Sequence, residues 1–60
     1  MTPRQFFDLV SEMRSAQKDY FAARKRGEPY NVCKVHKDKS IRLETRVDEE
    51  IKRVNNIINQ

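Results

Sequence analysis

The sequence has little glycine, proline or cysteine and no tryptophan, and these shortages exclude several kinds of protein. Its 60 residues include one glycine, two prolines and one cysteine. A single cysteine excludes an internal disulfide. Cys33 and His36 have the spacing of two metal ligands on one helical turn, but two ligands are too few for a closed site unless a dimer brings two pairs together. We therefore interpret them as a half-buried thiol and a solvated imidazole, and expect no bound metal.

Long apolar runs are also absent. No stretch approaches the roughly 18–20 apolar residues of a membrane span, and no signal peptide is visible after Met1. Two or three short elements offer little concavity, and three consecutive carboxylates, Asp48, Glu49 and Glu50, point around a helix instead of converging on a substrate. We expect a cytoplasmic protein that has no cofactor, is not an enzyme and does not contact membranes.

The net charge of +4 lies entirely in the middle of the chain. Residues 1–23 and residues 40–60 are each neutral, whereas residues 24–39 carry six basic and two acidic side chains. Such a segment attracts phosphates or acidic surfaces. The candidate anion or nucleic-acid contacts are therefore Arg24, Lys25, Arg26, Lys34, Lys37 and Lys39.

A first helix is expected over about residues 3–26. Thr2 and Gln5 have the spacing of a capping box, and Pro3 suits the first helical position, where no N–H is needed. Gly27 stands where a left-handed residue commonly ends a helix. Between these ends apolar residues recur every three or four positions, at Phe6, Leu9, Val10, Met13, Ala16, Tyr20 and Ala23.

A second helix is expected over about residues 40–58, after a basic connection over about 27–39. Ser40 or Asp38 would cap its start. The alternative is a longer helix that begins near residue 31, since no glycine or proline interrupts residues 30–60. The apolar stripe of this helix is Leu43, Val47, Ile51, Val54 and Ile58.

These two helices predict an all-α fold, a single antiparallel two-helix hairpin domain over residues 1–60. One facing helix cannot cover the first stripe, which Phe7 and Phe21 widen, and each large apolar side chain left exposed forfeits about 1.5–3 kcal/mol. Because twofold dimers are the commonest oligomers, we expect a homodimeric four-helix bundle; a different protein that supplies the missing helices is the alternative. The predicted dimer core is Phe6, Leu9, Val10, Met13, Tyr20, Leu43, Val47, Ile51, Val54 and Ile58.

Three functions are compatible with this pattern. The first is a small non-catalytic interaction or structural protein that acts as a homodimer. The second is a nucleic-acid-associated protein that uses residues 24–39, with Tyr30 placed to stack on an unpaired base, although no known reading module is present. The third is an accessory protein that binds a protein partner through Phe7 and Phe21.

Gln17 lies at the polar margin of the apolar stripe of the first helix. Its side chain either forms a hydrogen bond across a helix interface or is solvated.

Several short segments resemble a known group of proteins. The segments are Phe6-Phe7-Asp8-Leu9-Val10, Met13-Arg14, Ala16-Gln17-Lys18, Tyr20-Phe21, Leu43-Glu44 and Arg46-Val47-Asp48. They are similar to short, uncharacterised bacterial proteins that are often carried on phage or other mobile elements. The resemblance implies a two-helix hairpin and an intracellular setting, and it implies no activity. The chain departs from the group between Gly27 and Arg42, where its connection is longer and more basic.

Overall fold

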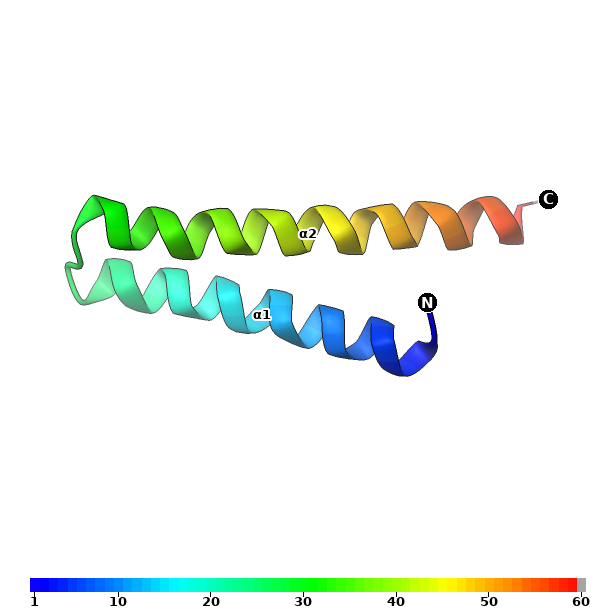
Figure 1. Ribbon diagram of the computed structural model, residues 1–60, viewed down its shortest axis with the longest axis horizontal. Coiled ribbons are helices and arrows are strands. Elements are labelled where there is room, and N and C mark those ends of the chain that lie inside the picture. The colour runs from blue at the N-terminus through cyan, green and yellow to red at the C-terminus, as the bar shows by residue number, and fades with distance from the viewer. Residues whose placement is uncertain (60) are drawn as a thin grey trace.

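Two helices and the short turn between them make up the part of the chain that the structure describes. The computed structural model describes residues 1–59. Helix α1 spans Pro3–Lys25 and helix α2 spans Tyr30–Ile58. They lie antiparallel in a rod that measures 48 × 17 × 13 Å (Figure 1). The predicted all-α hairpin is confirmed.

The start of α1 forms the capping box that the sequence predicts. The Gln5 backbone N–H donates to Thr2 Oγ1 at 3.1 Å, and the Thr2 N–H donates to Gln5 Oε1 at 2.9 Å. Pro3 occupies the first helical position. Two backbone donors that a helix otherwise leaves without partners are thereby satisfied, which fixes where α1 begins.

A glycine turn ends α1. Gly27 has a φ of +74°, in the left-handed region that other residues avoid. Its N–H donates to the Arg24 carbonyl at 3.1 Å, and the Glu28 N–H donates to the Ala23 carbonyl at 3.0 Å. This pair of bonds is a Schellman motif, and it turns the chain back toward α1. Gly27 therefore has the cap role that its position predicts.

The main prediction for the second helix is wrong at its start. Residues 30–39 belong to α2, so the connection is only four residues long and the helix begins next to the alternative start near residue 31. Pro29 is the cap residue, and no side chain caps α2. Asp38 and Ser40, the predicted caps, lie inside the helix, where Ser40 Oγ donates to the Lys37 carbonyl at 2.8 Å.

Packing explains why α2 extends back to the turn. The half-buried side chains there continue the apolar stripe toward Pro29, and helical packing against α1 outweighs the local preference of Ser and Asp for a cap. Those half-buried residues are Val32, Cys33 and His36.

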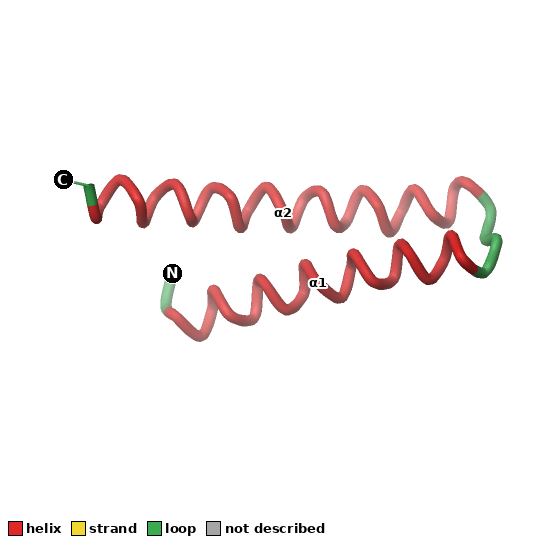
Figure 2. Tube along the Cα trace, turned by 180° about the vertical axis from the view of Figure 1, so that it is seen from behind, coloured by secondary structure: helices red, strands yellow, loops and turns green. Residues whose placement is uncertain are grey.

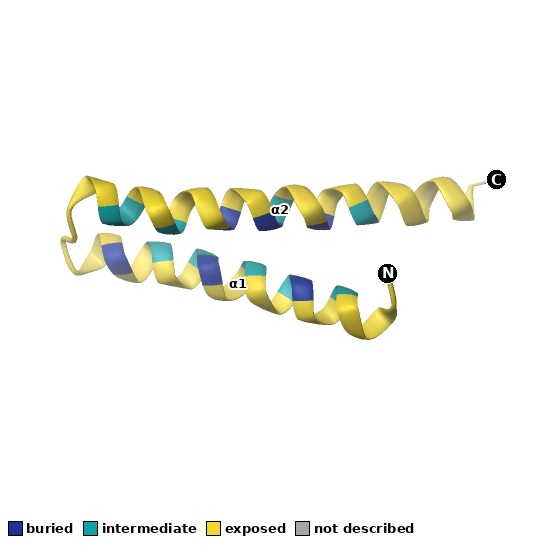
Figure 3. Ribbon diagram, in the orientation of Figure 1, coloured by how far each residue is buried: buried dark blue, intermediate teal, exposed yellow. Residues whose placement is uncertain are grey.

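The core between the helices is narrow. Leu9, Leu43 and Val47 form its centre together with Ala16, and Ala23 is fully buried nearer the turn. No large side chain among residues 1–59 is fully buried. Buried positions occur on the sides of α1 and α2 that face each other (Figure 3). Three more residues of the predicted core pack half-buried against this centre, namely Phe6, Val10 and Met13.

The helices approach closely at the turn and diverge toward the other end (Figures 1 and 2). Near the turn the contact positions hold the small residues Ala23, Ala16 and Ser40, all buried. Toward the N-terminus of α1 they hold Leu9 and Phe6, whose larger side chains separate the axes. With 29 residues against 23, α2 also extends about 9 Å further than α1. We call this divergent end the open end.

Candidate interaction surface

One long side of the hairpin carries apolar side chains from both helices. On α1, Phe6 and Val10 are half-buried and Phe21 is 65 % exposed, and on α2, Ile41 and Ile51 are nearly half exposed. The three residues of α1 are separated by four and eleven positions, close to whole helical turns, so they share a face. We call these five residues the apolar flank.

A hydrogen bond between Gln17 and Glu44 joins the two halves of the apolar flank. Gln17 Nε2 donates to Glu44 Oε1 at 2.8 Å, and Gln17 Oε1 accepts from Arg14 Nη1 at 3.0 Å. Gln17 and Glu44 line one hollow of about 450 Å³ with Phe21 and Ile41, which places these side chains on one side of the hairpin. Within residues 1–59, it is the only side-chain hydrogen bond between α1 and α2. Gln17 therefore joins the two helices of one chain.

Aromatic side chains extend the flank toward the turn. The Tyr20 and Phe21 rings lie 5.6 Å apart at an angle of 52°. The Arg24 guanidinium lies 5.8 Å from the centre of the Tyr20 ring, within the range of a cation–π contact. Tyr20, a predicted core residue, is half-buried, and Phe7 is as exposed as Phe21. Water therefore reaches most of the Phe7 and Phe21 side chains.

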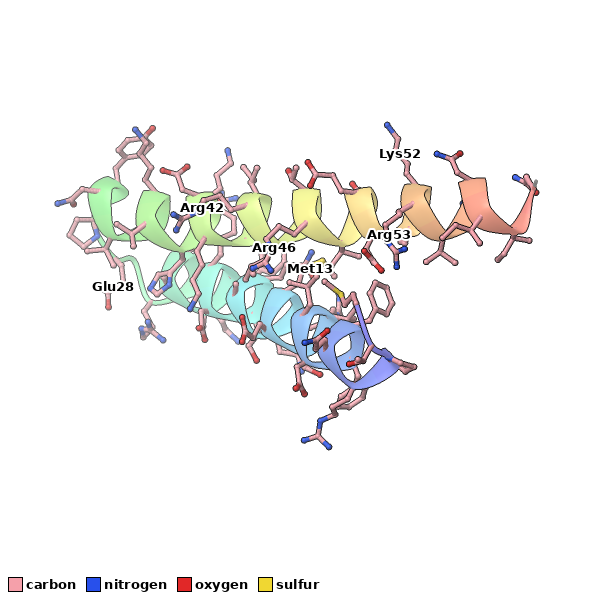
Figure 4. All side chains as sticks on the ribbon, turned by 45° about the vertical axis from the view of Figure 1, so that its right-hand side comes forward. Met13, Glu28, Arg42, Arg46, Lys52 and Arg53 are labelled. Carbon is pink, nitrogen blue, oxygen red and sulfur yellow. The ribbon has the colours of Figure 1, made fainter. Side chains whose placement is uncertain are left out.

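At the open end the diverging helices leave an apolar hollow of about 380 Å³, which we call the open-end hollow. Its apolar lining residues are Met1, Pro3, Phe6, Ile51 and Val54, and its polar lining residues include Glu50, Arg53 and Asn55. Figure 4 shows Met13 between the two helices and Lys52 on the side of α2 away from α1.

Three predicted core residues are not in the core of this chain. Ile51, Val54 and Ile58 are all exposed, Ile58 to 71 %. They lie where α2 diverges from α1 and then extends beyond it, so a single α1 cannot cover them. The sequence predicts them in the core of a dimer, so their exposure in one chain leaves that prediction untested.

The structure brings together only half of the predicted basic contacts. Arg24, Lys34 and Lys37 line a hollow of about 410 Å³ at the turn, which Tyr20, Tyr30, Cys33 and Glu28 complete; we call it the turn-end hollow. Lys25, Arg26 and Lys39 do not line it. Arg26 instead pairs with Glu28, its Nε 3.4 Å from Oε1.

The opposite side of the hairpin is charged. Asp8 and Glu12 of α1 lie across a hollow of about 350 Å³ from Arg46 of α2. Asp8 also pairs with Arg4 one turn earlier, at 3.3 Å. Exposed ion pairs of this kind contribute about 0–1 kcal/mol each. The two long sides of the hairpin thus differ in chemistry, and only one is apolar.

Ligand-type side chains do not gather in this part of the chain. Among residues 1–59, no three His, Cys, Asp or Glu side chains lie close enough to hold an ion. Cys33 is half-buried, and its Sγ–H donates to the Glu28 carbonyl at 3.6 Å. Cys33 thus makes a local contact at the turn.

Near the open end, Glu50 and Arg53 form a two-point ion pair. Arg53 Nη2 lies 2.6 Å from Glu50 Oε1, and Arg53 Nε lies 3.1 Å from Oε2. These hydrogen bonds, with the attraction of the Arg53 charge, lower the pKa of the Glu50 carboxyl below its ordinary value. The same contact raises the pKa of Arg53.

The sequence prediction does not include Ile41 in the candidate surface. It expects Ser40 or Asp38 to cap the second helix, and the apolar stripe that it assigns to this helix begins at Leu43. With α2 starting at Tyr30, Ile41 lies three residues before Glu44 and Ile51 seven after it, on the same side of the helix. The spacing of Ile41, Glu44 and Ile51 is the feature of the sequence that indicates a shared side of α2.

No protein-family model, curated protein or solved structure matches this chain. Neither α1 nor α2, within residues 1–59, has a stretch both apolar and long enough to span a bilayer.

Proposed function

We propose that this protein is a small, non-catalytic helical interaction protein that acts as a homodimer, with a second copy covering the apolar flank. The observation that supports the proposal is that both helices contribute exposed apolar side chains to the flank, while the core beneath it is small. Fully burying a side chain such as Phe21 or Ile41 stabilises a protein by about 1.5–3 kcal/mol. A chain of this length buries only about 60 % of its unfolded surface, so such gains are a large part of its stability.

The proposal is tested by measuring molar mass with light scattering after size exclusion. The wild-type chain is expected to elute with twice the 7.2 kDa mass of one chain at micromolar concentration. Phe21→Ser and Ile41→Ser are each expected to weaken the dimer by tenfold or more, because each leaves a polar group in an apolar contact.

Ile57 provides the control. Its side chain is 56 % exposed, close to that of Phe21, but it lies sixteen residues after Ile41 and so about 160° away around α2. Ile57→Ser is expected to leave the dimer unchanged. Equal weakening by Ile57→Ser and Phe21→Ser would mean that the apolar flank is not the interface.

A second candidate function is binding of single-stranded nucleic acid at the turn-end hollow. Three cationic side chains, Arg24, Lys34 and Lys37, border it together with the rings of Tyr20 and Tyr30. Cations that hold phosphates beside aromatic rings that stack on bases are the usual composition of such sites.

Fluorescence anisotropy with a labelled 20-nucleotide oligo-dT tests this candidate. If it is correct, binding at low salt weakens steeply as salt rises, and Lys34→Ser with Lys37→Ser weakens it much more than the control pair Lys25→Ser with Lys39→Ser. Equal effects of the two pairs would indicate a diffuse attraction to the net charge. Absence of binding at low salt would exclude the candidate.

A further inference from the structure

We infer that the two copies pair side by side in antiparallel orientation, so that Phe21 of each copy enters the open-end hollow of the other. This inference rests on the proposed homodimer and adds its geometry. Two features of the single chain carry it: the distribution of charge along the rod, and the distance between Phe21 and the open-end hollow.

Charge is strongly polarised along the length of the hairpin. The half nearest the turn, residues 14–42, carries nine basic and three acidic side chains, a net +6. The open half, residues 1–13 and 43–60, carries four basic and six acidic side chains, a net −2. The opposing halves lie at opposite ends of a rod 48 Å long, well beyond the ~8–10 Å screening length of physiological salt.

A twofold axis can pair the apolar flanks in a parallel or an antiparallel orientation. The uneven distribution of charge along the rod favours one of them. A parallel pair places two +6 halves against each other, which repel. An antiparallel pair places each +6 half against a −2 half, which attract. Because both arrangements bury the same apolar flank, the hydrophobic contribution is similar and electrostatic complementarity decides the orientation.

The spacing of the aromatic residues fits the antiparallel pair. Phe21 lies fifteen residues after Phe6, about 22 Å along α1, and Phe6 lines the open-end hollow. A twofold axis midway between them passes near Met13 of α1, and between Leu43 and Val47 of α2, the core residues against which Met13 packs. That axis brings the 65 %-exposed Phe21 of each copy to the hollow beside Phe6 and Ile51 of the other. An exposed aromatic ring that enters an apolar hollow is a common anchor of interfaces.

The native cysteine allows a direct test by pulsed electron paramagnetic resonance. A nitroxide label on Cys33 of the full chain reports one distance between the two copies. Cys33 lies ten residues, about 15 Å, from Leu43, so an antiparallel dimer places the labels about 30 Å or more apart. A parallel dimer places both labels at the same end, across the narrow width of the rods, so their separation is clearly shorter.

A second reporter controls for disturbance by the label, since Cys33 is half-buried. In a Cys33→Ser background, Asn31→Cys offers an exposed labelling position two residues nearer the turn. The antiparallel arrangement then requires a distance about 6 Å longer than that for Cys33, whereas the parallel arrangement requires no such increase.

The outcomes separate this inference from the proposed function. Long distances, with a dimer dissociation constant that rises several-fold between about 0.05 and 0.5 M salt, support the antiparallel pair. A dimer with short label distances, or one that salt strengthens, would overturn the orientation and leave the homodimer intact. A single-chain mass with no distance between copies would overturn the homodimer itself.

Discussion

Gln17 of α1 donates a 2.8 Å hydrogen bond to Glu44 of α2, beside the hollow that Phe21 and Ile41 also line. Both side chains are half-buried, so the bond is partly shielded from water. A polar pair on an otherwise apolar side favours one alignment of the helices over alignments shifted by a turn. The bond therefore fixes the register that brings Phe21 beside Ile41.

Replacing Gln17 with Leu is expected to lower the free energy of unfolding by about 1 kcal/mol, because Glu44 loses a partner while partly shielded from water. Urea denaturation followed by circular dichroism measures the change. Glu49→Gln, on an exposed position of α2, serves as the control and should have little effect. An unchanged midpoint for Gln17→Leu would show that the contact does not stabilise the fold.

Replacing Gly27 with Ala is expected to cost about 1–2 kcal/mol, although a Cβ at this position would meet no atom within 4 Å. The cost comes from the φ of +74°, which strains any L side chain. Thermal unfolding should show a clear loss for Gly27→Ala and a smaller one for Gly27→Asn, since Asn tolerates this region better. Equal stability of Gly27→Ala and the wild type would contradict the turn described above.

Enlarging Ala16 to Leu is expected to destabilise the hairpin by about 1–3 kcal/mol, because the side chain at this position is buried and has only 2 % of its surface exposed. The helices can accommodate the extra methyl groups only by separating near the turn. Ala22, exposed on α1, gives the control, and Ala22→Leu should be neutral. A stable Ala16→Leu variant would mean that the small residues do not set the close approach.

The Glu50–Arg53 pair predicts a specific acid sensitivity at the open end. The pKa of Glu50 in the folded chain lies below the ordinary 4.5, so the pair contributes stability above that pH and loses it as the pH falls through the folded value. A carbon-detected NMR titration of Glu50 is expected to show a midpoint below 4.5 that Arg53→Gln raises. A midpoint at 4.5 in the wild type would show that the pair does not form in solution.

Local signals in the sequence were sufficient to predict the hairpin and the bounds of α1. Thr2, Pro3, Gln5 and Gly27 predicted both ends of α1 because capping depends on residues close together in the chain. The start of α2 was predicted less well, since Ser40 has the identity of a cap but the surroundings of a core residue. Only contact with α1 distinguishes the two roles, and a single sequence does not contain that contact.

The candidate interaction surface was predicted only in part, for a related reason. Spacing placed Phe6 and Val10 on one face, but it could not show that α2 diverges from α1 near Ile51 and leaves a hollow there. That divergence arises because the contact positions hold small residues near the turn and larger ones, such as Leu9, toward the open end. The convergence of Lys34 and Lys37 with Tyr20 likewise depends on the short turn, which brings residues fourteen and more positions apart to one end.

Sedimentation equilibrium of the wild-type chain over a hundredfold range of concentration, with helicity measured on the same samples, tests most directly whether a second copy covers the apolar flank. We predict twice the mass of one chain at the highest concentration, and a joint loss of mass and helicity on dilution. A single-chain mass with unchanged helicity throughout would show that one hairpin is stable with Phe21 and Ile41 exposed, and would contradict the proposal.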